Sequence, residues 1–357
     1  MINHFDEPCG TGIFKYIGSC AKGLYCLRGL CTYVEQNKTG SDDVDMRSAE
    51  GHGLKNINWM KNIDDETYLG SMSIPGTHDT MTATVGSHWN RITVFGQCHS
   101  KALGQQLEMG IRFVDIRLRC YNNEFWLYHA HESVGISFKD TLKIMKSFLT
   151  SHPTETIIMS YQQEHSPYNC RGSCKGTNCF DNDLFKKEWN AYLPAYMQWA
   201  DYKKDYLPKL KWARGKVILV PRRSASLGFR EAYEENRWKS AEDGTFNIAS
   251  ASGDISSTPI FQGYIDSLKR NIKKSMNDQK NRIRPYITYL SANDIKYRAW
   301  LTPQHIATRV NPRIKSYLDE NGKDTTKNYG VVVMDFPPQG LVDEIIKQNP
   351  GNHVNTC

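Results

Sequence analysis

Apolar positions follow two alternating patterns along the chain from Trp59 onward. Short β-branched runs, such as Val217–Val220 and Val331–Val333, are typical of strands that are covered on both faces. Between these runs apolar residues recur every three or four positions, which predicts helices. We predict strands at 68–74, 110–119, 125–131, 156–161, 216–220, 286–290 and 329–335, a weaker strand at 246–250, and helices at 139–149 and 267–276. This alternation predicts an α/β fold in which helices wrap a parallel sheet.

The stretch Ser73–Thr80, Ser-Ile-Pro-Gly-Thr-His-Asp-Thr, overlaps the end of the first predicted strand. Pro75 and Gly76 are predicted to end that strand, because proline lacks an N–H donor and the pair favours a turn. His78 and Asp79 then follow the strand end, where a barrel enzyme carries its catalytic groups. An isolated His-Asp pair would more often be a structural loop pair, so its significance depends on other polar residues.

Polar residues also mark three later strands. Within 110–119, Asp115, Arg117 and Arg119 alternate with apolar residues. The strand at 125–131 ends with His129 and His131, and Asp335 ends the last predicted strand. Carboxyl ends of parallel barrel strands meet at one rim, so we expect these side chains to gather around His78.

Taken in order, these stretches resemble the X region of bacterial-type phosphatidylinositol-specific phospholipase C. The resemblance is carried by Ser73–Asp79, Asp115-Ile-Arg117, His129 and the run Pro-Thr-Glu-Thr-Ile-Ile-Met-Ser at 153–160. It extends from about Trp59 to the strand at 331–335 and the helix that follows, and it leaves out the first fifty or so residues. It implies a distorted, closed or nearly closed (β/α) TIM-type barrel.

Metal-free cleavage of a phosphodiester needs a base, an acid and positive charge beside the phosphoryl oxygens. Imidazoles suit proton transfer at neutral pH, and a guanidinium fork suits phosphate. The resemblance assigns His78 as the base steadied by Asp335, His129 as the acid steadied by Asp79, Arg117 as the phosphate clamp and Asp115 as a supporting carboxylate. His131 shares the strand face of His129 and remains its substitute. Calcium-dependent relatives have carboxylates where Arg117 stands, so no metal or other cofactor is implied.

The headgroup pocket matches the family less completely. Arg222 corresponds to the family arginine that contacts the inositol hydroxyls, and Asp254 is the nearest match to a pocket aspartate. Gln162, followed by Gln163 and Glu164, stands where the family has a lysine. The phosphodiester chemistry is therefore expected, whereas the inositol preference is open.

The function that the resemblance implies is cleavage of phosphatidylinositol, or of a glycosylated relative, to diacylglycerol and a cyclic inositol phosphate. A phospholipase with another headgroup preference is one alternative, because of Gln162. A lipid-binding or toxin-like module without turnover is another. The complete set of histidines, carboxylates and arginine argues against the latter, since a binding module has no need of two such imidazoles.

Charge and hydropathy favour a membrane surface as the partner. The net charge of +7 is modest for 357 residues and no dense basic stripe occurs, so an anionic phospholipid surface is favoured over nucleic acid. No apolar run approaches the ~18 residues of a spanning helix. Trp89 and Trp300 lie in connections after predicted strands, and we expect both at the rim that meets the membrane. The protein is expected to be a monomer.

The ten cysteines indicate an oxidising compartment. Four of them lie in the first 31 residues, which are too few to bury a core of their own, so two disulfides in unspecified pairing are expected there. A zinc site is disfavoured because that segment has no Cys-x2-Cys pair. We predict a cysteine-rich module at 1–35, a linker at 36–53 and a catalytic barrel at 54–357. Secretion is expected, although no signal peptide is visible after Met1.

Overall fold

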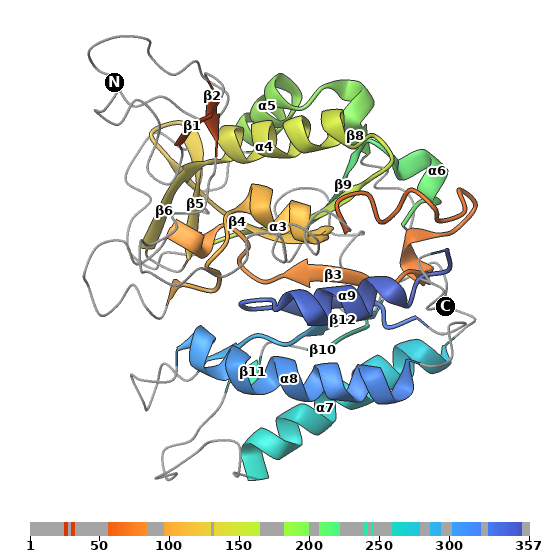
Figure 1. The fold of residues 1–357 in the computed structure, drawn as a ribbon. Helices are drawn as coiled ribbons and strands as arrows, with labels where there is room; N and C mark the ends of the chain where they lie inside the picture. Colours follow the sequence, from red (N-terminus) through yellow and green to blue (C-terminus); the bar gives the residue numbers. More distant parts are fainter. Residues whose placement is uncertain are drawn as a thin grey trace, which may run out of the picture.

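The structure is a computed structural model and describes residues 25–27, 30–32, 56–84, 96–129, 132–164, 182–199, 207–221, 239–241, 244–245, 259–278, 286–293, 302–322 and 328–351. Its centre is a ten-stranded mixed sheet surrounded by helices (Figure 1). Eight strands form a parallel path in the order β10 (Lys239–Ala241), β12 (Tyr286–Tyr289), β14 (Val331–Met334), β3 (Ile74–Thr77), β4 (Phe113–Tyr121), β7 (Ile157–Gln163), β9 (Val217–Pro221) and β8 (Gln198–Trp199).

The parallel path has two free ends. Among the strands that the structure describes, β8 and β10 end the path without pairing with each other. The predicted parallel sheet is thus confirmed, and in this part of the chain it is not closed by hydrogen bonds into a full ring. Two short pairs lie outside the sheet: β1 (Tyr25–Leu27) with β2 (Leu30–Thr32), and β11 (Gly244–Thr245) with β13 (Ala292–Asn293).

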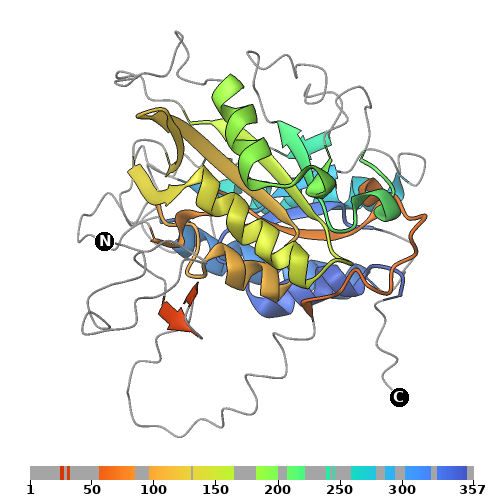
Figure 2. The same ribbon diagram turned by 90° about the horizontal axis from the view of Figure 1, so that it is seen from above.

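Helices cover the sheet on its outer side. They are α3 (Leu103–Met109), α4 (Phe138–Ser151), α5 (Asn182–Tyr192), α6 (Leu210–Ala213), α7 (Pro259–Asn277), α8 (Pro303–Asn321) and α9 (Gln339–Lys347), with short 3₁₀ turns η2 (Leu69–Ser71), η3 (Thr82–Thr84) and η4 (Ala195–Met197). α7 packs on β12, α9 packs on β3, and α4 packs on α5 and β5. The view from above shows this layer around the strands (Figure 2). None of the described helices is long and apolar enough to cross a bilayer.

The sequence patterns explain the helices and strands that were predicted best. α4 begins at the Ser137 cap, whose hydroxyl accepts a bond from the Asp140 amide, and its apolar stripe is buried. All four residues of β14 are buried, as a continuous apolar run requires in a parallel strand. Gly76 permits the close approach of β3 to β4, because a side-chain Cβ there would lie 2.9 Å from the Cβ of Phe113.

The first predicted strand was placed wrongly. Residues Leu69–Ser71 form a 3₁₀ turn, and the strand itself runs from Ile74 to Thr77, through Pro75 and Gly76. Pro75 is in register with Val332 of β14, but its carbonyl points towards β4, and pairing with β4 begins only at Gly76. The missing N–H therefore falls on the side where the ladder has not yet begun, so proline is tolerated. Its carbonyl still accepts a bond from the Arg112 amide.

The third predicted strand is real but is antiparallel to its neighbour. β5 (Glu124–His129) folds back on β4 through a turn at Asn122 and Asn123, both with positive φ. β6 (Glu132–Ser137), which the sequence did not predict, pairs antiparallel with β5. The hairpin therefore interrupts the expected alternation of strand and helix. The weaker strand at 246–250 lies outside the described residues, as do the linker at 36–53 and all of the cysteine-rich module except β1 and β2.

Candidate active site

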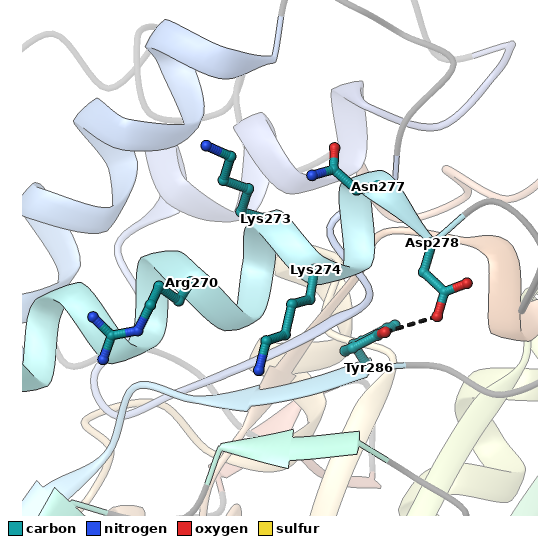
Figure 3. Close-up of a pocket in the computed structure, with 6 residues that line it drawn as sticks. All are labelled: Arg270, Lys273, Lys274, Asn277, Asp278 and Tyr286. Carbon is teal, nitrogen blue, oxygen red and sulfur yellow. Dashed lines mark hydrogen bonds between the residues drawn. The ribbon is translucent and has the colours of Figure 1, made fainter.

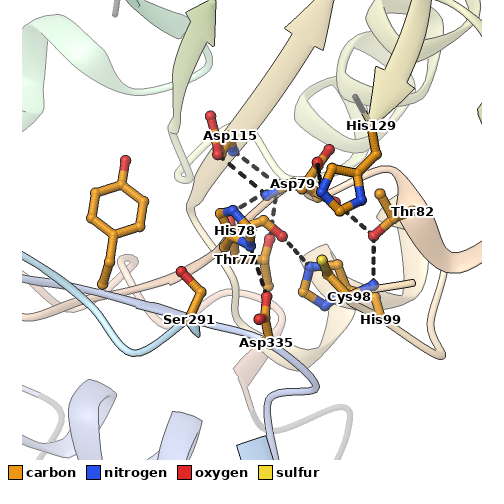
Figure 4. A network of polar contacts seen from close by, with 12 residues as sticks. Thr77, His78, Asp79, Thr82, Cys98, His99, Asp115, His129, Ser291 and Asp335 are labelled. Carbon is orange, nitrogen blue, oxygen red and sulfur yellow. Dashed lines mark hydrogen bonds and ion pairs between the residues drawn. The ribbon is translucent and has the colours of Figure 1, made fainter. Parts of the chain in front are cut away.

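The ends of three adjacent parallel strands converge on His78. His78 and Asp79 directly follow β3, and Asp335 directly follows β14. Thr77 pairs with Met334 on one side and with Val114 on the other, so the residues that follow them lie side by side. Figure 4 shows His78 between Asp335 and Asp115, with His129 beside Asp79. The polar rim predicted from the sequence is thus formed at the carboxyl ends of the strands.

His78 is held at both ring nitrogens. Its Nδ1 lies 2.9 Å from Asp335 Oδ1, and its Nε2 lies 2.6 Å from an Arg117 guanidinium nitrogen. A guanidinium can only donate, so Nε2 is the acceptor and Nδ1 carries the proton that is donated to Asp335. His78 thereby has its basic lone pair on Nε2, as a general base requires.

His129 lies across from His78, with 6.5 Å between the two ring centroids. Its Nδ1 donates to the Gly96 carbonyl at 2.8 Å, and its Nε2 lies 3.6 Å from Asp79 Oδ2. The carbonyl fixes a proton on Nδ1, so Nε2 is the ring nitrogen that faces the Asp79 carboxylate. His129 and Asp79 are therefore placed to share a proton.

Arg117 is surrounded by carboxylates. Its guanidinium nitrogens lie 3.2 and 3.3 Å from one oxygen of Asp115, 3.5 Å from Asp79 and 3.9 Å from Glu164. Its side chain is only 11% exposed. These contacts fix the planar donor fork beside His78, where it can bind a phosphoryl group.

Asp79 combines backbone strain with burial. It has a φ of 43°, a conformation that aspartate tolerates better than most residues. The Asp115 carboxylate accepts from the Asp79 amide, and the Thr82 hydroxyl donates to the Asp79 carbonyl. Burial raises the pKa of the Asp79 carboxyl to about 6, although Arg117 and the two histidines oppose the shift. Asp79 can therefore exchange a proton close to neutral pH.

We expect Asp79→Asn to change the pH dependence of stability. The carboxyl titrates near 3.8 in the unfolded chain and near 6 in the fold, so the stability it contributes is complete below pH 4 and is lost as pH rises to about 6. Asparagine does not titrate, so the variant should gain about 2–3 kcal/mol relative to the wild type between about pH 4 and pH 7. Urea unfolding of the variant and of the wild type at about pH 4 and pH 7 measures this gain. The same difference in unfolding free energy at both pH values would mean that Asp79 is already ionised at acid pH.

Several residues of the site were not singled out from the sequence. The His99 Nε2–H donates to the His78 carbonyl at 2.6 Å, and burial lowers the pKa of His99 to about 4, so His99 is neutral. The Thr80 hydroxyl accepts from the Asp115 amide, which links the two strand ends. The Tyr289 ring meets the His78 ring edge-on, with centroids 6.4 Å apart. Thr80 lies within the recognised motif, whereas no periodicity or spacing marked His99 or Tyr289.

The two imidazoles are largely buried. His78 is only 8% exposed and the His129 side chain 18%. Both imidazoles lie against the carboxylates at the strand ends, and those carboxylates are themselves buried. Substitution of His78 will therefore affect packing as well as chemistry.

Of the predicted substrate residues, two lie in the described part of the chain. Gln162 is paired with Arg117 in the register of β4 and β7, and Glu164 contacts the Arg117 guanidinium. Both are therefore adjacent to Arg117. Outside the described residues lie Arg222, Asp254, Trp89, Trp300 and His131.

One group of side chains has the composition of a metal site. His78, Asp335 and Cys98 place one ligand atom each within 4.8 Å of one another, and all three residues are buried. Cys98 is a free cysteine. The sequence-based search for zinc ligands looked for paired cysteines and therefore missed this combination.

A separate pocket lies at the opposite end of the strands. Its volume is about 470 Å³, and it is lined by Arg270, Lys273, Lys274, Asn277, Asp278 and Tyr286 (Figure 3). Tyr286 begins β12, whereas the histidines follow the ends of strands, so this pocket is not part of the site.

Comparison with known proteins identifies the region that contains His78, Asp79, Asp115, Arg117 and His129, whereas Asp335 lies beyond it. Residues 72–223 match the family model of the phosphatidylinositol-specific phospholipase C X domain. The resemblance inferred from the sequence is thereby confirmed. The chain is 26% identical to the 1-phosphatidylinositol phosphodiesterase of Listeria monocytogenes, over 82% of this chain and 85% of that protein. It is also 26% identical to the enzyme of the same name from Staphylococcus aureus strain Newman, over 82% and 94%.

Solved structures of the X-domain enzymes have the same fold. The phosphatidylinositol-specific phospholipase C from Listeria monocytogenes superposes with a TM-score of 0.66 at 22% identity, over 82% of this chain and 98% of that one. The pentafluoro-Phe form of the Staphylococcus aureus enzyme gives 0.65 at 23% identity, over 84% and 99%. These matches show a TIM-barrel-like α/β fold for the chain.

Proposed function

We propose that the protein is a metal-independent phospholipase C that cleaves phosphatidylinositol, or a glycosylated relative, by acid–base catalysis between His78 and His129. The bacterial relatives support a phosphatidylinositol-specific phospholipase C-like function. The observation that carries the mechanism is the placement of two imidazoles 6.5 Å apart, each beside a carboxylate, with Arg117 in contact with one of them.

The first chemical step uses the free lone pair of His78. The inositol 2-hydroxyl gives its proton to Nε2 while its oxygen attacks the phosphorus of the same molecule. The Asp335 carboxylate, 2.9 Å from Nδ1, stabilises the imidazolium that results. Nucleophile and phosphorus belong to one molecule, so the step is effectively unimolecular. Binding of the phosphoryl group draws the Arg117 fork away from Nε2 and frees it for the hydroxyl.

His129, together with Asp79, completes the displacement. The bond between phosphorus and the diacylglycerol oxygen breaks, and the leaving oxygen takes the proton held by His129 and Asp79. Because burial raises the pKa of Asp79 to about 6, this pair can keep a proton near neutral pH. The products are diacylglycerol and a cyclic inositol phosphate, with one proton moved from substrate to His78 and one from His129 to the leaving group.

Gln162 bears on which lipid headgroup the site accepts. Its pairing with Arg117 places an uncharged amide next to the clamp, where the family resemblance expects a lysine. A neutral amide binds hydroxyls without adding charge, whereas a lysine attracts a further anionic group. We therefore keep a phospholipase with another headgroup as the alternative.

A panel of liposomes tests the proposal. Vesicles that contain phosphatidylinositol, phosphatidylcholine, phosphatidylserine or phosphatidylglycerol are incubated with the full chain, and the released headgroup is identified. Release of cyclic inositol phosphate from phosphatidylinositol alone supports the main proposal. Release from another lipid supports the alternative headgroup. Binding without release from any vesicle would make the protein a lipid-binding module.

We also infer that the protein acts as a secreted monomer at the membrane surface, with disulfides in the module at 1–35. The cysteine content supports this location.

Trp300→Ala should weaken binding to anionic vesicles and spare hydrolysis of a soluble monomeric substrate, because an indole at the rim anchors the protein in the headgroup layer. Vesicle sedimentation and the soluble assay measure the two effects. Equal losses in both assays would assign Trp300 to the core.

A further inference from the structure

Cys98 lies beside the pair that forms the proposed base. A ring nitrogen of His78, a carboxylate oxygen of Asp335 and the sulfur of Cys98 are within 4.8 Å of one another (Figure 4). Cys98 is fully buried, and among the described cysteines it is the free one. The catalytic steps derived above do not use its thiol.

The position of Cys98 is fixed by two backbone hydrogen bonds. Its amide donates to the Thr82 hydroxyl at 3.0 Å, and its carbonyl accepts from the Phe336 amide at 2.8 Å. Phe336 follows Asp335 directly and has a φ of 43°, so this bond joins the cysteine to the turn that presents the carboxylate. Cys98 lies in the buried segment before α3, and these two bonds hold it against residues that follow β3 and β14.

Imidazole, thiolate and carboxylate together form a donor set that suits zinc. Zn²⁺ binds His, Cys and Asp at about 2.0–2.3 Å, often with three protein ligands and one open position. The hard cations Ca²⁺ and Mg²⁺ prefer oxygen ligands and gain little from a thiolate. The surrounding charge also favours a cation, because four carboxylates (Asp79, Asp115, Glu164 and Asp335) face one guanidinium, so the site is net negative even with the proton that His129 and Asp79 share.

We propose that Cys98, His78 and Asp335 bind Zn²⁺ and that this ion inhibits the enzyme by occupying the base. The inhibition rests on the function proposed above, whereas the binding does not. A neutral imidazole has a single basic lone pair. A zinc ion on either nitrogen of His78 takes that lone pair, so none is left to accept the proton of a substrate hydroxyl. The thiol proton of Cys98 passes to solvent when the thiolate binds the metal.

Inhibition is tested by titration of the full chain with ZnCl₂, with CaCl₂ and MgCl₂ as controls, in the phosphatidylinositol assay. Zinc should abolish turnover, EDTA should restore it, and calcium and magnesium should have no such effect. In Cys98→Ser the basal rate should persist, and half-inhibition should need at least ~10-fold more zinc, because one ligand is lost. Inhibition of Cys98→Ser at the wild-type zinc concentration would overturn the proposal, as would full wild-type activity in saturating zinc.

Binding is tested separately with Co²⁺ as a spectroscopic probe. Wild-type protein should develop a near-ultraviolet thiolate-to-cobalt band that zinc removes and that is absent in Cys98→Ser. Asp335→Asn should weaken cobalt binding while the band persists at saturation. This readout needs no turnover, so it stands even if no lipid is cleaved. A wild-type spectrum without a thiolate-to-cobalt band would overturn the site, and this result does not depend on whether Cys98→Ser folds.

Discussion

Replacing His78 with alanine is expected to reduce turnover on phosphatidylinositol vesicles by ~10²–10⁴. The substitution removes the lone pair on Nε2, whereas the Arg117 and Asp335 side chains that contacted the imidazole remain. His78 is only 8% exposed, and its loss leaves the Asp335 carboxylate without its imidazole partner, so a loss of about 1–3 kcal/mol of stability should accompany the change. Initial rates and a urea unfolding curve measure the two effects.

A matched control separates chemistry from stability. His152 follows α4, bonds to Asn58 and lies at the opposite end of the barrel, so His152→Ala should keep normal turnover. His129→Ala should lose activity to a similar extent as His78→Ala, since it removes the acid. Near-normal turnover in His78→Ala would exclude it as the base. The same result for His129→Ala would transfer the acid role to His131.

The sequence predicted best those elements whose pattern reflects burial on one or both faces. α4 and β14 have strong apolar periodicity or a continuous apolar run, and both lie within two residues of their predicted bounds at each end. The rim of polar residues was also predicted, because strand ends in a parallel sheet must meet at one edge. Placement of His78, Asp115, Arg117 and Asp335 followed from that rule and from the family motif.

Errors arose where tertiary context outweighs local propensity. Pro75 was expected to end a strand, but β3 tolerates it because the pairing with β4 begins one residue later. The β5–β6 hairpin could not be distinguished from parallel strands, since alternation of apolar residues is the same in both. Residues such as His99 and Cys98 act through single contacts to strand ends, and no pattern of spacing records such contacts.

Part of the family motif proves to be structural. Glu155, within the recognised run at 153–160, is completely buried and pairs with Arg112 at 2.9 Å. Arg112 also donates to the carbonyls of Leu107 and Ile111, so this pair joins α3 to the start of β7. It lies before β4 and β7, away from the strand ends that carry the histidines. A motif residue can therefore mark the scaffold as well as the chemistry.

Arg117→Ala should abolish most of the activity, and EDTA should not reduce the activity of the wild type. The guanidinium contacts His78 and Asp79 and is the cation available to the phosphoryl oxygens among the described residues of the site, so its loss removes the charge that stabilises the transition state. We expect a decrease of ~10²–10³ in kcat, measured under saturating vesicles. Arg117→Lys should recover part of it, because lysine keeps the charge but not the two-pronged geometry.

The outcome depends on the fork rather than on positive charge in general. Arg119 lies two residues further along β4 and stacks on the Tyr128 ring at 5.1 Å, so Arg119→Ala is a matched control that should keep its turnover.

If zinc occupies the base, EDTA raises the rate, which remains consistent with metal-independent chemistry. Loss of activity in EDTA with recovery in Ca²⁺ would contradict it, because the phosphate would then be bound by calcium. In that case Asp79, Asp115 and Glu164, which surround Arg117, would be the carboxylates to test as its ligands.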